Sequence, residues 1–494
     1  MRSGRGRYGN LAIPSMPSPA APLLFAGPAL ALSLSLSVSA GAQSHPFPAS
    51  GHYAQGYLPS SATAAAAQAS YANWKSKYLK DDCGSGYYRV DNGSGNASTF
   101  SEGQGYGMVL TAYFGDRTEF DGLWAFAKKN YNTKGLMGWH VTCSGATTSD
   151  GGSGSATDGD TDIGFGLLVA SAQWGGRYGA DAMTYLSTLK TVDFTTCSPT
   201  GRNIPTAGSW QGSAACTTSG GSNTSYWMPG YYRVFASFTG DGFWSKAADD
   251  VVALYGLAAN SSTGIIVNEV DQTGAGLSGQ TYDYNSCRIP WRAALDYLWF
   301  GTPAVRTAMT KMTAWASSVG IGKIVDGYNA DGTATGRYTG LNEWVGGFTV
   351  GATTDSQAIV DAFATDFVGI ADDNGGYYGS SLRTLYLLTL SGNQWNPMAA
   401  LADGGAPSPG GSGDGGGSPA GPDAGSSTGG EAGVTPPTAD ASTGGAGADG
   451  GPPTAGVAGS SGCGCVVAER RPSIPGATAL AFVVGAALRR RRRH

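Results

Sequence analysis

The chain is poor in charged residues and in histidine. Of its 494 residues only 13% are charged, the formal net charge is −5, and four are histidine. So little charge gives no basic surface for nucleic acid, and we expect no nucleic-acid partner. His140 is the only histidine well inside the central region, and no cysteines are spaced as Cys-x-x-Cys. A zinc site is therefore disfavoured, and we expect neither a metal nor a cofactor.

Several catalytic motifs are also missing. No Gly-x-Ser-x-Gly turn precedes a helical pattern, no cysteine pairs with a histidine, and no Walker A loop or dinucleotide fingerprint follows a strand pattern. These absences argue against hydrolase triads and nucleotide-binding folds. Carboxylates remain, and two carboxylates acting on an acetal perform glycoside hydrolysis. Aromatic residues make up 11% of the chain, and their flat faces stack well on sugar rings.

The two ends of the chain differ from its middle. Residues 1–42 combine scattered arginines with an apolar run and a small-residue end, which predicts a secretory signal peptide. Residues 403–462 are nearly all Gly, Ser, Pro, Ala, Thr and Asp, which predicts a flexible linker. Residues 463–494 contain "GCGC", a short apolar run and an arginine cluster, and they resemble the C-terminal sorting tags of myxobacterial surface proteins. That resemblance implies secretion and retention at the outer cell surface, with the protein tethered to the envelope.

The middle of the chain holds five cysteines, at 83, 143, 197, 216 and 287. Cys197 and Cys216 flank a polar loop, and we expect them to be bridged in an oxidising compartment. An odd count leaves one cysteine over. Cys287 lies in an apolar segment and is expected to be buried.

Residues 43–402 read as one domain of repeated helix pairs. Apolar helical patterns end on an aromatic-rich turn and a glycine, at 115, 175, 240, 301 and 392, and a new helical pattern follows. Glycine at such a position supplies the left-handed cap that stops one helix and permits a tight hairpin. The first four recur roughly every 60 residues, as a helix pair plus a loop would. An open solenoid would need capping repeats that the sequence does not show. We therefore predict an all-α closed ring of helix hairpins, an α/α barrel, in a monomer.

Glycines follow an acidic residue in the stretch "SEGQGYGM". Gly103, Gly105 and Gly107 come directly after Glu102 at the start of a helical pattern, where each costs on the order of 1 kcal/mol relative to alanine. Close approach of a ligand or of another backbone would offset that loss. For Gly105 and Gly107 ligand approach and tight helix packing explain the choice equally well. For Gly103, beside the carboxylate, we expect a ligand.

A second acidic helix start, "SATDGDTDIGF", holds Asp158, Asp160 and Asp162. Taken alone, such a stretch is explained by helix capping or calcium binding. Alternatively, its carboxylates could raise the pKa of Glu102. Glu102 at a helix N-terminus favours its anion, and a nearby carboxylate or burial would raise its pKa, as an acid catalyst needs.

These stretches, together with "SYWMPGYYRVFASFTGD" and "YNSCRIPWRAALDYLWFG", resemble glycoside hydrolase family 8 from about residue 74 to residue 395. The resemblance implies an (α/α)6 barrel and hydrolysis of β-1,4-linked polysaccharide by a single displacement that inverts the anomeric carbon. It assigns the proton donor to Glu102 and the sugar-distorting, substrate-holding role to Asp158. Further substrate contacts are implied for Trp139, Tyr226, Trp227, Tyr284, Asn285, Arg288, Tyr377 and Tyr378.

One position departs from the family pattern. The cellulase branch of the family places its catalytic base three residues before the arginine of "YDxxRxPW", and here that residue is Asn285. An amide cannot take a proton from water at neutral pH. Another branch also has asparagine there and takes its base from an inserted loop. We predict Asp283 as the base, with Glu269 next and Asp271 as a third candidate.

Three functions fit these observations. We expect an endo-acting glycosidase of β-glucan, either cellulose or mixed-linkage glucan, and a chitosanase is the second possibility. A surface protein that binds polysaccharide without cleaving it is the third, because the base position is altered. Glu102→Gln separates enzyme from binder, since it abolishes turnover only in an enzyme.

Overall fold

The computed structural model describes residues 43–49, 53–147 and 150–403. The predicted signal peptide, the linker beyond Asp403 and the sorting segment lie outside these residues. Within them, no helix combines the length and the apolar character that crossing a bilayer requires.

Six helices of the described chain are buried along most of their length. A helix without a polar face is stable only where other elements surround it, so these six form the interior. They are α2 (Ser101–Phe114), α4 (Thr157–Trp174), α6 (Pro229–Thr239), α8 (Ile289–Phe300), α10 (Asn342–Ala352) and α12 (Gly376–Leu390).

Six other helices bury only part of their surface and form an outer layer. They are α1 (Ala64–Tyr78), α3 (Arg117–Lys129), α5 (Tyr178–Asp193), α7 (Gly242–Ala258), α9 (Pro303–Val319) and α11 (Gln357–Val368). Each inner helix packs against the outer helix that follows it, except that α12 packs against α1. A short last helix, α13 (Pro397–Asp403), packs on α4 and α6.

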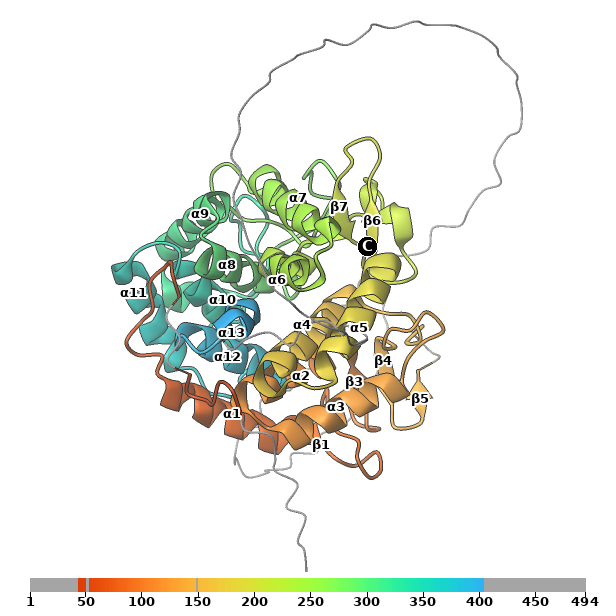
Figure 1. Ribbon diagram of the computed structural model, residues 1–494. Coiled ribbons are helices and arrows are strands. Elements are labelled where there is room, and N and C mark those ends of the chain that lie inside the picture. Colours follow the sequence, from red (N-terminus) through yellow and green to blue (C-terminus); the bar gives the residue numbers. More distant parts are fainter. Residues whose placement is uncertain (1–42, 50–52, 148–149, 404–494) are drawn as a thin grey trace, which may run out of the picture. The chain divides into compact units, whose positions relative to one another are not determined.

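The inner helices contact one another in chain order, from α2 with α4 through to α12 with α2, so the ring is closed. Figure 1 shows the helices following one another around this ring in the order of their colours. The predicted α/α barrel is therefore confirmed.

Three of the five hairpin glycines are the predicted left-handed caps, whereas Gly175 has a ψ of −144° and Gly392 lies one residue beyond the α12 cap, Ser391. Gly115, Gly240 and Gly301 cap α2, α6 and α8 with φ of 83°, 69° and 70°, in the left-handed region that glycine enters without strain. Gly175 and Gly392, after α4 and α12, also have positive φ, at 62° and 75°. The chain therefore reverses direction where the sequence indicated.

Short antiparallel strands and 3-10 turns decorate the connections between helices. The strand pairs are β1 (Leu79–Lys80) with β2 (Arg89–Val90), β3 (Thr99–Phe100) with β4 (His140–Thr142), β4 with β5 (Gly145–Ala146), β6 (Phe194–Thr196) with β7 (Asn203–Pro205), and β8 (Ser222–Asn223) with β9 (Glu269–Val270). The 3-10 turns are η1 (Gly212–Cys216), η2 (Thr224–Tyr226), η3 (Ser286–Arg288) and η4 (Ile321–Lys323).

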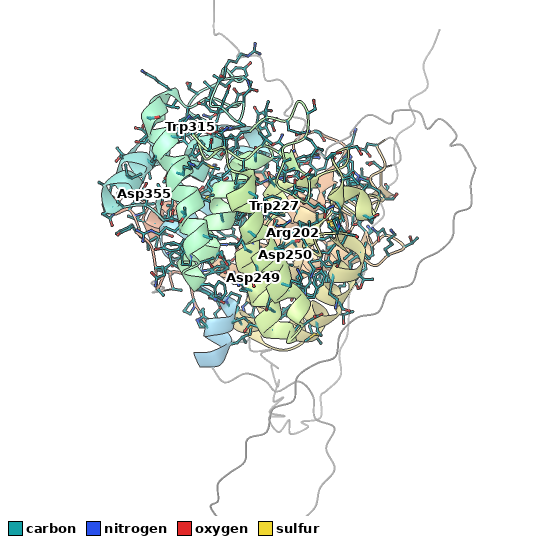
Figure 2. All side chains as sticks on the ribbon, turned by 90° about the horizontal axis from the view of Figure 1, so that it is seen from above. Arg202, Trp227, Asp249, Asp250, Trp315 and Asp355 are labelled. Carbon is teal, nitrogen blue, oxygen red and sulfur yellow. A yellow bond between two sulfur atoms is a disulfide. The ribbon has the colours of Figure 1, made fainter. Side chains whose placement is uncertain are left out.

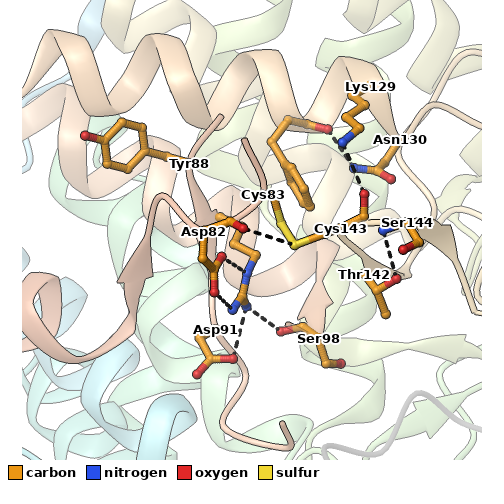
Figure 3. Close-up of a disulfide and its surroundings, with 12 residues drawn as sticks. Asp82, Cys83, Tyr88, Asp91, Ser98, Lys129, Asn130, Thr142, Cys143 and Ser144 are labelled. Atoms are coloured by element: carbon orange, nitrogen blue, oxygen red, sulfur yellow. Dashed lines mark hydrogen bonds and ion pairs between the residues drawn. A yellow bond between two sulfur atoms is a disulfide. The ribbon is translucent and has the colours of Figure 1, made fainter. Parts of the chain in front are cut away.

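Two disulfides tie these connections down. Cys197 is bonded to Cys216, as predicted. Cys83 is bonded to Cys143 and joins the loop after α1 to the turn between β4 and β5 (Figure 3). Cys287 is free and buried, which confirms that expectation.

Candidate active site

The first turns of the inner helices meet around one arginine. Arg288, immediately before α8, reaches Glu102 in the first turn of α2 and Asp158 in the first turn of α4. It also contacts Ser225, just before α6, and its guanidinium lies 5.9 Å from the ring of Tyr378 in the first turn of α12. These helices therefore begin at the same end of the barrel, and the predicted site residues converge there.

Arg288 bridges the two acidic residues through a single nitrogen. Its Nη1 donates to Glu102 Oε2 at 2.7 Å, to Asp158 Oδ2 at 2.8 Å and to the Tyr106 hydroxyl at 3.0 Å. The side chain is 1% exposed, so water does not screen these charges. A guanidinium suits this place because its donors have a fixed geometry and it keeps its charge when buried.

Glu102 has the protonation behaviour of an acid catalyst. Burial raises its pKa to about 7; the Arg288 charge opposes the rise and the Asp158 charge adds to it. The Tyr377 hydroxyl donates to Glu102 Oε1 at 2.8 Å and also favours the anion. A carboxylic acid that ionises near neutral pH keeps its proton until a leaving group needs it. The prediction that burial and a neighbouring carboxylate counter the helix N-terminus is confirmed.

Glycines bring α2 and α4 close enough for this arrangement. A Cβ on Gly105 would lie 2.6 Å from Asp162 Cβ and 2.8 Å from Gly159 O, and a Cβ on Gly159 would lie 2.6 Å from Glu102 N. Real Cβ atoms do not approach so closely, so any side chain at either position would push the two helices apart. Glu102 and Asp158 can share one arginine because of this contact.

The expectation that Gly103 makes room for a ligand is wrong. A Cβ there would meet Tyr377 Cε2 at 3.1 Å and Val90 Cγ1 at 3.3 Å, and at Gly107 it would meet Val90 Cγ2 at 2.6 Å. Protein atoms therefore occupy the space that these glycines leave. Tight packing explains all three glycines of the stretch.

The three aspartates of α4 have separate partners. Asp158 Oδ1 accepts the N–H of Gly159 at 2.8 Å, and its Oδ2 faces Arg288. Asp162 forms a buried two-point ion pair with Arg292, at 2.7 and 2.5 Å. Among the described residues these aspartates do not form a cluster suited to a metal ion. The calcium interpretation of this stretch gains no support.

The base candidates lie on the connection between α7 and α8. Asp283 is half-buried and accepts from Asn268 Nδ2 at 2.6 Å and from the Thr281 hydroxyl at 2.9 Å. Two residues later, Asn285 Oδ1 accepts from Arg288 Nη2 at 3.2 Å. Asp283 thus lies two residues before Asn285, which contacts Arg288 of the Glu102 cluster.

The other two candidates differ from Asp283 in their surroundings. Burial, and then the charge of Asp283, raise the pKa of Glu269, which accepts from Gln280. Asp271 Oδ1 accepts from both the N–H and the hydroxyl of Thr273 and from a further backbone N–H in the same turn, so its carboxylate is held by the loop itself. These local contacts do not test the predicted order Asp283, Glu269, Asp271, which stays a prediction.

Most of the predicted substrate-contact aromatics surround the Glu102 cluster. Trp139 is partly exposed, and its carbonyl accepts the N–H of Ser101, one residue before Glu102. Tyr284 is partly exposed, and its carbonyl accepts the Tyr378 hydroxyl at 2.6 Å. The Tyr226 ring lies 5.8 Å from the Arg288 guanidinium.

Trp227 is placed differently from these residues. Its indole N–H donates to Ser222 Oγ at 3.0 Å, and the side chain has no exposed surface. Trp227 is labelled in Figure 2. Its ring packs edge-on against Tyr255, whose hydroxyl donates to the Trp227 carbonyl. Trp227 is thus a core residue that supports the neighbouring Tyr226.

Two residues that the sequence reasoning did not single out lie near this end. Glu343, in the first turn of α10, is 1% exposed, and none of the other described residues donates a hydrogen bond to its carboxylate. Burial raises its pKa to about 7. Trp210 is 49% exposed and packs on Gly154 and Gly208, where added Cβ atoms would lie 2.8 and 2.5 Å from its ring. Each carried a signal: an acid at the start of an apolar helix, and a tryptophan in a polar loop.

A closed ring of helix hairpins with a buried acid, a bridging arginine and aromatic neighbours at one end suits a polysaccharide-degrading glycoside hydrolase. The family model described as "Glycosyl hydrolases family 8" matches residues 45–392. The chain belongs to this family, and it is a glycoside hydrolase.

Relatives of known activity cover the same region. Endoglucanase A of Acetivibrio thermocellus is 33% identical over 354 residues, which are 69% of this chain and 72% of that protein. A beta-glucanase of Niallia circulans is 32% identical over 389 residues, 72% of this chain and 92% of that protein. The apo structure of a beta-1,3-1,4-glucanase from Paenibacillus sp. X4 matches with a TM-score of 0.63 and 30% identity, over 72% of this chain and all of that one.

Proposed function

We propose that this glycoside hydrolase is an extracellular enzyme that cleaves internal β-1,4 bonds of β-glucan, cellulose or mixed-linkage glucan, with inversion. The observation that carries this proposal is the buried Glu102, with its pKa raised to about 7 beside Asp158 and Arg288. A binding protein would have no need of an acid held near neutrality.

In the proposed reaction, Glu102 donates its proton to the leaving oxygen while Asp158 holds the distorted sugar. Asp283 takes a proton from the water that attacks the opposite face of the ring. An inverting pair of carboxyl groups needs roughly 6.5 to 9.5 Å between them so that one water fits. Arg288 stays charged throughout and balances whichever carboxylate is ionised.

The substrate class rests on the relatives. Proteins named endoglucanase and beta-glucanase reach 33% and 32% identity, and the similar solved structure is that of a beta-1,3-1,4-glucanase. The aromatic residues beside Glu102 suit neutral sugar rings, which stack on such faces.

The location outside the cell rests on the ends of the chain and on its cysteines. The signal-peptide pattern and the "GCGC" tail support secretion and tethering to the envelope. Two disulfides in the described domain fit an oxidising compartment.

Reducing-sugar assays of the purified protein on carboxymethyl cellulose, lichenan, chitosan and xylan test the substrate. We expect activity on the first two, with viscosity falling faster than new reducing ends appear, as internal cleavage requires. Proton NMR of the first product should show the α-anomer. Activity on chitosan alone would replace β-glucan by chitosan, and activity on none of the four would overturn the proposal.

A further inference from the structure

Two more carboxyl groups lie next to each other in the core behind Asp158. Asp160 in α4 and Asp193 at the end of α5 have no exposed surface. Asp160 Oδ1 accepts from the Tyr185 hydroxyl and, at 3.3 Å, from the N–H of Met137, and Asp193 Oδ1 accepts from a serine hydroxyl at 2.7 Å. The remaining oxygen of each, Oδ2, has no donor from the other described residues.

The Asp193 carboxyl group lies within hydrogen-bonding reach of the Asp160 carboxyl group and of the Thr157 hydroxyl. Ionised carboxylates are acceptors only, so a hydrogen bond between the two carboxyl groups requires a proton on one of them. Burial, and then the charge of Asp193, raise the pKa of Asp160, and burial raises the pKa of Asp193 to about 7. The pair therefore keeps a proton through neutral pH.

We propose that Asp160 and Asp193 share one proton, and that this hydrogen bond positions Asp158 for catalysis. Asp193 also accepts the hydroxyl of Ser155, so the backbone on both sides of Asp158 is anchored to the same pair. The Met137 N–H attaches the segment that carries Trp139. The role in catalysis rests on Asp158 acting on the sugar, as proposed above.

Titratable and polar groups face the pair from every element around it. The Lys134 ammonium lowers the pKa of Asp193, and the Asp158 charge raises that of Asp160. The groups are Asp158 and Thr157 from α4, Tyr185 from α5, Ser155 from the loop before α4, and Tyr131 and Lys134 from the loop after α3.

The positioning role is tested by comparing Asp160→Asn with Asp160→Ala. An amide keeps the Oδ1 acceptor and places an N–H where the shared proton lies, whereas alanine removes both. Asp160→Asn should keep kcat within about threefold of wild type, and Asp160→Ala should lower kcat by about tenfold or more with a smaller change in KM. Asp181→Asn is the matched control, because Asp181 lies on the same helix α5 as Asp193 and accepts from Trp124 instead. Equal loss of kcat in the Asn and Ala variants would overturn the positioning role.

The shared proton is tested by counting protons released on unfolding at pH 8, from calorimetry in buffers of different ionisation enthalpy. Unfolded aspartates are ionised at this pH, so the wild type should release about one proton more than Asp160→Asn, and Asp181→Asn should match the wild type. Asp193→Asn should also release about one proton less than wild type, and it serves if Asp160→Asn does not fold. A count equal to that of wild type in the folded variant would overturn the shared proton. The count needs no substrate, so it separates failure of this inference from failure of the proposed function.

Discussion

The proposed proton donor and the base candidates lie on different kinds of structure, which we call the donor side and the base side. Glu102 and Asp158 lie on the first turns of inner helices and are fixed by Arg288. Asp283 and Glu269 lie on the long connection between α7 and α8, where their hydrogen-bond partners, Asn268, Thr281 and Gln280, also belong to that connection. In the proposed mechanism, the proton donor is therefore held by helices of the barrel, and the base belongs to a loop.

Glu102→Gln should have the largest effect. The amide keeps the shape of the side chain but has no proton to give, so kcat should fall by about 10³-fold or more while the binding of oligosaccharide changes little. Steady-state kinetics on soluble glucan and calorimetric titration with an oligosaccharide measure the two quantities. Equal turnover in wild type and variant would show that the cluster around Arg288 is not the donor side.

Three single substitutions in one loop test which residue is the base. Asp283→Asn should lower kcat by about 10²-fold or more, because the amide cannot take a proton from water. Glu269→Gln should cost less, and Asp271→Asn should mainly lower the melting temperature, since Asp271 caps its own turn. A larger loss of kcat in Glu269→Gln than in Asp283→Asn would move the base to Glu269.

The dependence of kcat/KM on pH tests the protonation of Glu102 alone. Glu102 must be protonated to act, so with a pKa of about 7 the value of kcat/KM should fall as the pH rises above 7. The Tyr377 hydroxyl stabilises the anion, and Tyr377→Phe should therefore raise the pKa of Glu102 and move the alkaline limb upward by about one pH unit. A limb that stays in place would show that another group controls it.

The smallest effect is expected from the aromatic residues around both sides. Trp139→Ala and Trp210→Ala should each raise KM by about five- to tenfold with little change in kcat, because a stacking face is lost without touching the reacting atoms. Phe300→Ala is the control, since this exposed ring lies at the other end of α8. An equal rise in KM for the control would mean that exposed rings act through stability alone.

Much of the fold and of the donor side was predictable because their signals are local. A helix that ends on glycine, or an acid followed by small residues, is visible within ten residues of sequence. The bond between Cys83 and Cys143 was not predicted, because 60 residues separate them and only the folded chain brings them together. The role of Gly103 was misjudged for the same reason, since Tyr377 and Val90 come from distant segments.

The identity of the base was less predictable because a loop has no repeating pattern of apolar residues that shows which side chains face the site. A carboxylate in the connection before α8 can cap a turn, as Asp271 does, or face the substrate, and the residue types alone do not separate these roles. Glu343 escaped attention because its first glycine, Gly346, comes three residues after the acid and not directly beside it as at Glu102, although both are buried acids at the start of an inner helix.

The single guanidinium shared by Glu102 and Asp158 makes this cluster electrically neutral when Glu102 is protonated. With Glu102 protonated, the positive charge of Arg288 and the negative charge of Asp158 cancel; with Glu102 ionised, the cluster carries one excess negative charge. A neutral glucan chain therefore meets no net charge at this cluster, and in the proposed mechanism the negative charge of the site lies on the base. A cationic polysaccharide bound here would stabilise the ionised form of Glu102 and lower its pKa. A smaller fraction of the enzyme would then carry the proton that the proposed cleavage needs.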